Sequence, residues 1–282
     1  MNSIDTQALK ERYCPEGSKL RRNQLELLDM LLDLAAICKE HNIQWWLSSG
    51  TLLGAARHAG FIPWDDDIDI VMTRKEAKRL KKILSESNND KYAYQSIESD
   101  IEYTNLYCKF RKLNDQNLKT SVKRHQFLKY RGRFVDIFSI EKTSYFSARA
   151  AKVIYYNLQH MTVHIKIKWL RRVMIRFFEF LCLCMVNPLL RIIGLINPRN
   201  EYHYSLGEGW AKHTFFMKDT LPLTTAMFEG HEFPVPKNMD AYLTNVYGDW
   251  RTLPSEESIL KSLHSDEYRE EILEVKNNDT QS

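Results

Sequence analysis

The sequence predicts an α/β protein of the α+β type, in which a mixed sheet is flanked by helices. Amphipathic helical patterns, the first at Lys19–His41, alternate with short β-branched and aromatic runs, the first at Ile43–Leu47. The second half adds a long and unusually apolar helical segment at Trp169–Ile196. Because 282 residues can bury one full-sized core and show no internal repeat, we expect a single domain.

This domain is expected to span residues 1–275, to include a helical apolar insertion at 145–200, and to end in a frayed polar tail at 276–282. The 40 basic and 36 acidic residues are nearly balanced, so the composition predicts no nucleic-acid partner and leaves anionic ligands or membranes open. Five irregularly spaced cysteines and a polar N-terminal stretch without an apolar leader favour a cytoplasmic protein.

A turn that can face a phosphate follows the first strand. Strand Ile43–Leu47 stops at Ser48–Gly50, and helix-forming residues follow at Thr51–His58. Free backbone N–H groups and the helix dipole favour a phosphate at such a helix start, and Gly50 allows close approach. The turn is a weak signal alone, but acidic residues follow it on the next strand.

A second strand and helix begin at Asp67. The run Asp67–Met72 opens with strict polar and apolar alternation, and Thr73 with Glu76 forms a capping-box pattern at the start of helix Arg74–Ser87. Three further strands are expected at Tyr92–Ile97, Thr104–Leu113 and Arg133–Ile140.

The apolar insertion is expected to contain a helix from Ser147 to His160 and another at Trp169–Ile196. Its longest uncharged run, Phe180–Leu190, is shorter than the roughly 20 residues that cross a bilayer, and we expect Pro188 to kink or end the helix. A buried core pair and an interfacial membrane helix both remain open. The membrane interpretation is supported by flanking arginines that can meet anionic headgroups, namely Arg171, Arg172, Arg176 and Arg191.

The C-terminal part alternates turn residues with short apolar pieces. Phe228–Phe233 is typical of a hairpin, which we expect Pro234 and Pro236 to break. Asn238 is a candidate cap for a short helix that ends at Tyr247.

The run DDDID at residues 65–69 crowds carboxylates together. Such a run is often a solvated loop, in which water and salt screen the repulsion. Here Asp67 and Asp69 flank Ile68, so on a strand both acids point to one face while Ile68 and Ile70 enter the core. Two acids on a rigid, half-buried surface favour a divalent metal site.

A calcium-binding EF-hand loop is a competing interpretation, because carboxylates occupy its ligand positions at Asp65, Asp67, Asp69 and Glu76. Position six of that loop needs a sharp turn with positive φ, which the β-branched Ile70 resists. We therefore favour a catalytic metal site.

Asp136 is a lone acid in the apolar run Arg133–Ile140, where an unpaired charge is costly. Metal-assisted phosphoryl transfer commonly uses a carboxylate on a neighbouring strand, which makes Asp136 a candidate third ligand. An ion pair with Arg131 or Arg133 is the alternative. The predicted catalytic and metal-binding residues are Asp67, Asp69 and Asp136.

The block 48–72 (SSGTLLGAARHAGFIPWDDDIDIVM) resembles the signature of the LicD and fukutin-related family of the nucleotidyltransferase superfamily. The resemblance continues through Lys109 and Arg111 (YCKFRKLND), Asp136 (FVDIF) and residues 228–250 (FEGHEFPVPKNMDAYLTNVYGDW). It covers most of the chain apart from its two ends and the apolar segment.

The resemblance implies a nucleotidyltransferase-like fold and transfer of a phospho-alcohol, typically phosphocholine from CDP-choline, to a hydroxyl of a cell-surface glycan such as lipopolysaccharide, capsule or a teichoic acid precursor. Together with the acidic pattern, it predicts Mg²⁺ or Mn²⁺ as cofactor and a CDP-alcohol donor. From the apolar segment we expect peripheral attachment to the inner face of the cytoplasmic membrane, near a lipid-linked glycan acceptor. A nucleotidylyltransferase that modifies a sugar, drug or protein hydroxyl is the alternative. A non-catalytic metal-binding or membrane-surface protein is a third interpretation.

By position, the metal-binding acids of the family match the three aspartates above, and its phosphate-facing turn matches Gly50 and Thr51. Asp65 would support the metal ligands, and Asp66 would face solvent. Candidates for neutralising the diphosphate are Arg57, His58, Lys109 and Arg111. For the last two, a solvated strand face is an equal alternative.

Two features bear on the substrates. The family often carries a proline and an acid after the strand of the third carboxylate, where this chain has Ser139, Ile140 and Glu141. A choline group favours an aromatic cage, and the available rings, which also suit a core, are Trp45, Trp46, Trp64, Tyr247 and Trp250.

Overall fold

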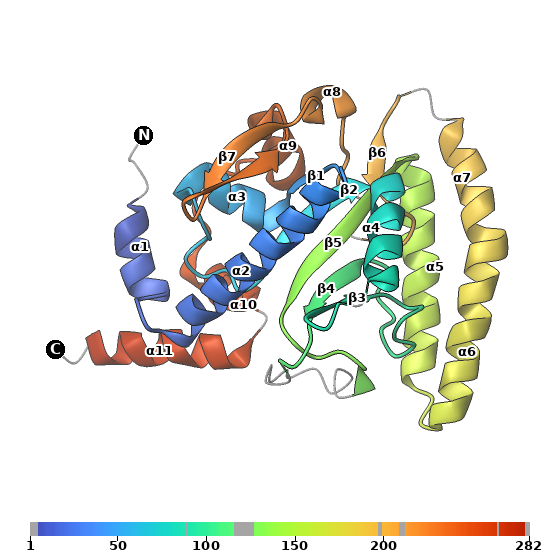
Figure 1. Cartoon of the computed structure of the whole chain (residues 1–282), viewed down its shortest axis with the longest axis horizontal. Coiled ribbons are helices and arrows are strands. Elements are labelled where there is room, and N and C mark those ends of the chain that lie inside the picture. The colour runs from blue at the N-terminus through green and yellow to red at the C-terminus, as the bar shows by residue number, and fades with distance from the viewer. Residues whose placement is uncertain are drawn as a thin grey trace.

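The computed structural model describes residues 5–87, 89–115, 127–196, 199–208, 212–263 and 265–279. Its main sheet contains β1 (Trp45–Leu47), β2 (Asp69–Thr73), β3 (Tyr92–Gln95), β4 (Cys108–Lys112), β5 (Phe134–Lys142) and β6 (Tyr202–Tyr204). The strand order is β1-β2-β5-β4-β3, and β6 pairs with the last residues of β5 (Figure 1). Among these strands β2 and β5 run parallel and the other neighbours antiparallel. The predicted mixed sheet is confirmed.

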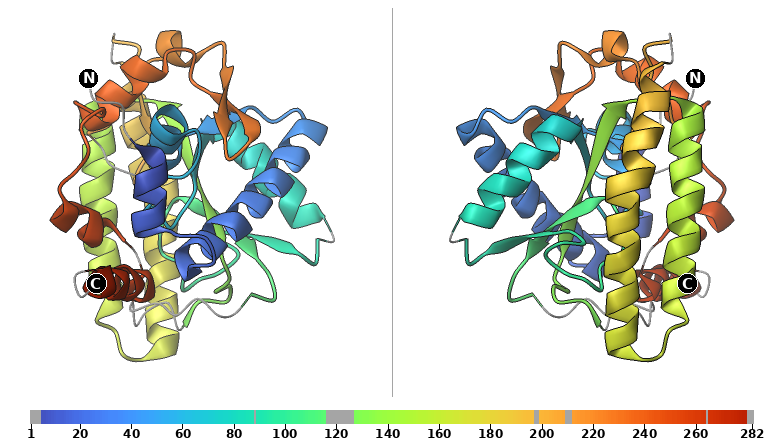
Figure 2. Two further views of the ribbon diagram at one scale, coloured as in Figure 1. Left: turned by 90° about the vertical axis from the view of Figure 1, so that its left-hand side faces the viewer. Right: turned by 90° about the vertical axis from the view of Figure 1, so that its right-hand side faces the viewer.

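Two helices lie side by side against this sheet, α2 (Lys19–Glu40) and α4 (Arg74–Glu86) (Figures 1 and 2). The Ser18 hydroxyl caps α2, whose leucine stripe is buried in the main core as its periodicity predicts. Arg79 of α4 donates to the carbonyl oxygens of His41 and Asn42, just beyond α2. The Thr73 hydroxyl accepts from the Glu76 N–H at 3.4 Å, so Thr73 caps α4 as predicted. The Glu76 carboxylate binds Arg79 and does not complete the capping box.

The apolar insertion is a helical hairpin of α5 (Tyr145–Val163) and one long second arm (Figure 2, right). That arm consists of α6 (Lys168–Leu181), the π-helical segment η2 (Cys182–Val186) and α7 (Asn187–Leu195). Of the two effects expected of Pro188, a kink or the end of the helix, the second is wrong, because helical structure continues through it. Pro188 lies in the first turn of α7 directly after the π-helical turn, where the changed hydrogen-bond pattern accommodates its missing N–H.

The flanking arginines of the second arm do not stand free as lipid-binding cations. Arg171 and Arg172 both bind the buried carboxylate of Glu102, at 2.9 and 3.0 Å. The remaining two pair with acids as well, Arg176 with Glu179 and Arg191 with Glu141.

The C-terminal part adds the hairpin β7 (Thr224–Phe228) and β8 (His231–Val235) and the helix α9 (Met239–Tyr247), capped by Asn238 as predicted. Pro234 does not break this hairpin but pairs with Thr225 within β8, because a two-stranded sheet leaves each strand an open edge where a missing N–H is tolerated. The remaining helices are α1 (Thr6–Tyr13), α3 (Ser49–His58), α8 (Met217–Thr220), α10 (Glu256–Ser262) and α11 (Asp266–Asp279). Helix α11 carries helical backbone into the stretch expected to be a frayed tail.

Candidate active site

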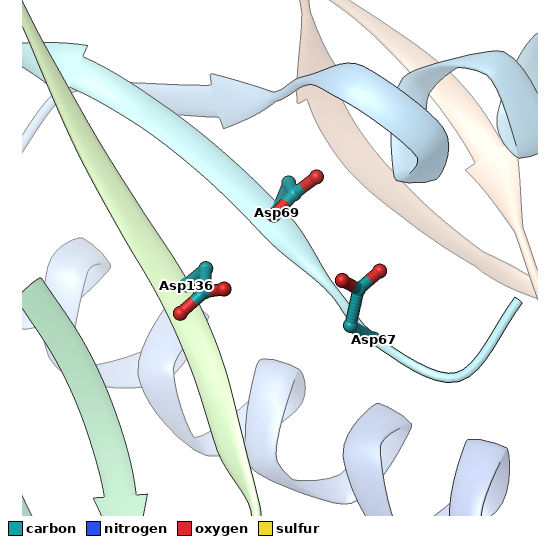
Figure 3. Close-up of side chains that lie close together, drawn as sticks. All are labelled: Asp67, Asp69 and Asp136. Carbon is teal, nitrogen blue, oxygen red and sulfur yellow. The ribbon is translucent and has the colours of Figure 1, made fainter. Parts of the chain in front are cut away.

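The three predicted acids come together where β2 and β5 begin. Asp69 is the first residue of β2 and is the direct partner of Asp136 on the parallel strand β5, so both carboxylates lie on one face of the sheet. Asp67 precedes the strand rather than belonging to it, which corrects the expected strand start, while Ile68 and Ile70 are buried as expected. One carboxylate oxygen from each of Asp67, Asp69 and Asp136 lies within 4.8 Å of the others (Figure 3).

The backbone of Asp69 is held by the turn that follows β1. The Asp69 N–H donates to the Thr51 hydroxyl at 2.8 Å, and the Ser48 N–H donates to the Asp69 carbonyl at 3.1 Å. Thr51 is buried. Its hydroxyl therefore fixes the position of a predicted metal ligand, a role that differs from the predicted contact with phosphate.

The same turn starts helix α3 (Ser49–His58). Ser48, at its N-cap, makes no side-chain cap bond, because its hydroxyl lies 3.0 Å from the Tyr242 hydroxyl. Ser49 adopts a left-handed φ of 47°, an unusual conformation for a serine. A Cβ on Gly50 would lie 2.6 Å from Oδ2 of Asp65, so glycine permits the close approach of this carboxylate. The uncapped helix start and the acidic run are thus immediate neighbours.

Asp65 and Asp66 have separate roles. Burial, reinforced by the negative charge of Asp67, raises the pKa of Asp65 well above its usual value. Its carbonyl accepts from the Gln24 side chain at 2.9 Å. Asp66 does not simply face solvent as expected, since its carboxylate accepts from the Ser265 N–H at 3.1 Å and its carbonyl from the Asn23 side chain.

Asp136 pairs with a cation that was not expected as its partner. The Lys109 ammonium binds the Asp136 carboxylate, and the two side chains are 7% and 9% exposed. Register pairs these residues across β4 and β5, and the ammonium lies 3.3 Å from the centroid of the Phe134 ring. Arg133 pairs with Asp115 instead. The interpretation of Lys109 as a solvated strand residue is therefore wrong.

Arg111 is also buried, two residues further along β4. Its guanidinium donates to the Gln95 side chain at 2.6 Å and to the carbonyl of Gly132, and it stacks on the Phe134 ring at 4.5 Å. Burial lowers its pKa. Arg111 thus holds three chain segments together, and its expected contact with a diphosphate stays a prediction.

Arg57 and His58 are engaged on other sides of α3. The Arg57 side chain donates to the Trp250 carbonyl at 2.7 Å, and Nδ1 of His58 lies 2.9 Å from the Thr6 hydroxyl. Burial lowers the pKa of His58 to about 4, so its ring is neutral. Their assignment to the diphosphate also stays a prediction.

The geometry fits a divalent metal and excludes the calcium loop. Residues Asp69 to Thr73 form a strand, and Glu76 belongs to α4, where it binds Arg79 at 2.5 Å. An EF-hand loop would need a sharp turn and a ligating glutamate at these places. Three converging carboxylate oxygens from rigid strands are instead the hard donor set that suits Mg²⁺ or Mn²⁺.

Two tyrosines border the acids. The pKa of Tyr107 is raised by burial and by the negative charges of Asp136, Asp69 and Asp67. The pKa of Tyr247 is raised by burial and by the negative charges of Asp69 and Asp65. Both phenols therefore lie within electrostatic reach of the cluster. Tyr107 was not predicted, although it lies two residues before Lys109 and just before β4, and the Lys109 ammonium is 5.1 Å from the centroid of its ring.

The aromatic residues proposed for a choline cage fall into two groups. The rings of Trp45, Trp46 and Trp64 are buried in the main core. Tyr247 is 43% exposed, and the partly buried Trp250 stacks with Arg251 at 4.3 Å. Tyr247 is thus the one member of the proposed set that is both exposed and near the acids.

A sheet of parallel and antiparallel strands that brings three acids together at one end is the arrangement of a nucleotidyltransferase-type transferase domain. The family described as LicD/FKTN/FKRP, nucleotidyltransferase domain, matches residues 42–180, which include all three acids and Lys109. Residues 42–180 thus form a LicD-family domain, and the chain is a phosphotransferase.

Several relatives are similar to the chain. The lipopolysaccharide cholinephosphotransferase LicD of Haemophilus influenzae is 28% identical over 258 residues, which cover 84% of this chain and 93% of the relative. An uncharacterized protein of Rickettsia prowazekii is 40% identical over 35% of this chain and 34% of its own length. The ribitol 5-phosphate transferase FKRP of Homo sapiens is 43% identical over 37 residues, 13% of this chain and 8% of the relative.

Proposed function

We propose that the chain transfers phosphocholine from CDP-choline to a hydroxyl of a cell-surface glycan such as lipopolysaccharide. The observation that carries this proposal is the cluster of Asp67, Asp69 and Asp136 within a LicD-family domain. The relative from Haemophilus influenzae, which covers most of both chains, supports choline phosphate as the transferred group.

The three acids would hold Mg²⁺ or Mn²⁺, which supplies positive charge against the donor diphosphate. In the proposed reaction, the acceptor oxygen forms a bond to the phosphorus of phosphocholine, the bond to CMP breaks, and the hydroxyl proton is released. The uncapped start of α3 at Gly50 offers backbone N–H groups to a phosphate oxygen. Lys109 stabilises the charge of Asp136 from the side of β4.

Tyr247 is the aromatic residue that we assign to the choline group. It is partly exposed and within reach of the acids, and a quaternary ammonium is attracted to the face of an aromatic ring. Ribitol phosphate is the second candidate, favoured by the short match to FKRP. We propose that the reaction takes place in the cytoplasm, at the inner face of the cytoplasmic membrane.

The test is a transfer assay with purified protein, a panel of CDP-alcohols that includes CDP-choline and CDP-ribitol, and glycan acceptors. Asp67→Asn and Asp136→Asn are expected to lower CMP release at least about a hundredfold, because each removes one anionic oxygen donor. Asp66→Asn is the matched control, since it lies in the same run and its side chain can still accept from Ser265. Full activity of both ligand variants would refute the proposed site.

The mass added to the acceptor separates the remaining alternatives. Phosphocholine or ribitol phosphate identifies the transferred alcohol, whereas an added nucleotide would show that the chain is a nucleotidylyltransferase. Removing divalent metal with a chelator is expected to abolish transfer, and adding back Mg²⁺ or Mn²⁺ to restore it. Transfer that continues in the chelator would exclude the metal assignment.

A further inference from the structure

The second arm of the helical hairpin exposes an apolar face. Figure 2 (right) shows the two arms of the hairpin, α5 and the arm from α6 to α7, side by side on the outside of the molecule. The six side chains that define this hairpin face are large and each between 55% and 67% exposed: Trp169, Val173, Phe177, Phe180, Leu189 and Ile192. An exposed apolar surface of this length marks an interaction site.

The opposite side of the second arm packs against α5. The interpretation of this arm as a buried core helix is therefore correct for that side only. Cys182 and Leu190 join Tyr155 of α5 in a small second core, and the Asn187 side chain donates to the Tyr155 hydroxyl at 2.9 Å. The hairpin face points away from this core. It therefore needs a separate explanation.

The arm is held flat against the rest of the molecule. By length and composition alone, Lys168–Leu195 is apolar enough to cross a membrane. However, Arg171 near one end of the arm pairs with Glu102, which lies between β3 and β4. Arg191 near the other end pairs with Glu141 of β5. A membrane-spanning orientation would break both pairs, so the arm fits a position along a surface.

The hairpin is basic around its apolar face. Residues 145–196 contain eight Lys and Arg residues against one acid, Glu179. Within the described part of the chain, four of these cations make no ion pair: Arg149, Lys152, Lys166 and Lys168. Lys166 and Lys168 lie at the tip of the hairpin and alternate with the exposed Ile167 and Trp169.

A pocket opens between the two arms. It lies where both arms meet the segment between β3 and β4, and it is lined mainly by apolar side chains, among them Leu106, Leu158, Ile175 and Phe178. Leu183, on the exposed side of the second arm, forms part of its wall. An apolar pocket beside an apolar face can accept a hydrocarbon chain.

We propose that the hairpin face lies in the plane of an anionic lipid bilayer, with its aromatic and aliphatic side chains at the acyl boundary and its lysines at the headgroups. The pocket between the arms would take an acyl chain from that bilayer. A second copy of the chain fits less well, because a symmetric dimer would bring two basic surfaces together. The proposal is independent of which phospho-alcohol the enzyme transfers.

The test is sedimentation of the full chain with phosphatidylcholine vesicles and with vesicles that also contain phosphatidylglycerol. We expect binding to the anionic vesicles, and the triple variant Phe177→Gln, Phe180→Gln, Leu189→Gln is expected to reduce the bound fraction at least about tenfold. Because these side chains are exposed, the variant is expected to keep the circular dichroism spectrum of the parent. Met227→Gln with Leu253→Gln is the control, since it removes exposed apolar side chains elsewhere.

A second measurement needs no destabilising change. Phospholipids brominated along their acyl chains are expected to quench the fluorescence of Trp169, and this part of the quenching is expected to disappear in Trp169→Phe. Absence of vesicle binding, equal loss in the control variant, or no Trp169 quenching would overturn the proposal. So would a dimer in light scattering that the triple variant converts to monomer, because it would show that a second copy covers the face. Neither measurement depends on transferase activity, so a failure here would remove the membrane location but leave the proposed transfer reaction standing.

Discussion

Lys109 and Asp136 face each other across β4 and β5, and their ion pair is buried at the edge of the acidic cluster. Since a buried charge without a partner is costly, Lys109→Met is expected to destabilise the fold by about 3 kcal/mol. Denaturant unfolding measures this loss. Lys109→Arg, which keeps the charge, is expected to lose less.

The same variant reports on metal binding. A divalent ion at Asp136 replaces part of the lost positive charge, so Mg²⁺ is expected to raise the stability of Lys109→Met more than that of the parent. The comparison is a pair of unfolding curves for each protein, with Mg²⁺ and with a chelator. An identical response of the two proteins to Mg²⁺ would contradict Asp136 as a ligand.

Thr51 is expected to act through Asp69. Its hydroxyl accepts the Asp69 N–H at 2.8 Å, so Thr51→Val removes the acceptor while keeping the shape of the side chain. We expect the concentration of Mg²⁺ needed for half-maximal activity to rise several-fold, because the ligand is less firmly placed. Thr51→Ser retains the hydroxyl and is expected to restore the parental value. If valine and serine behaved alike, the hydroxyl would have no positioning role.

Two glycines of α3 allow a matched comparison. A Cβ at Gly50 would meet the end of the Asp65 side chain at 2.6 Å, whereas a Cβ at Gly54 would meet the backbone oxygen of Gly60 at 2.4 Å. A carboxylate can swing aside and a packed backbone cannot. Gly50→Ala is therefore expected to lose transferase activity with little change in melting temperature, and Gly54→Ala to lose melting temperature. The opposite pattern would separate Gly50 from the site.

The part of the site that is local in sequence was predictable. Alternation around Ile68 placed Asp67 and Asp69 on one side, and the apolar surroundings of Asp136 marked it as unusual. Periodicity similarly predicted the sheet and its covering helices. These signals depend only on near neighbours along the chain.

Pairings between distant segments were not predictable. The partner of Asp136 depends on the register of β4 against β5, and the partner of Asp66 is Ser265, 199 residues further on. Register and long-range packing are tertiary properties that no local pattern encodes. Pro188 illustrates the same limit, since a π-helical turn beside it overrides a reliable local rule.

The carboxyl group of Glu208 predicts a pH dependence of stability. It accepts from the Ser139 N–H at 2.7 Å and lies 2.9 Å from the Ser139 hydroxyl. The charge of Glu141 raises its pKa and the charge of Arg74 lowers it. Burial raises the pKa of Glu208 to about 8, from an ordinary value of 4.5. The folded protein thus favours the protonated form, so this contribution to stability is complete below about pH 4.5 and is lost as the pH rises through about 8.

Glu208→Gln isolates this effect, because the amide stays neutral and can keep both contacts with Ser139. The melting temperatures of variant and parent are expected to coincide near pH 4, and the variant is expected to be the more stable protein near pH 9. Thermal unfolding followed by circular dichroism over this pH range measures the difference. A constant offset between the two curves at every pH would show that Glu208 does not titrate between its unfolded and folded pKa values.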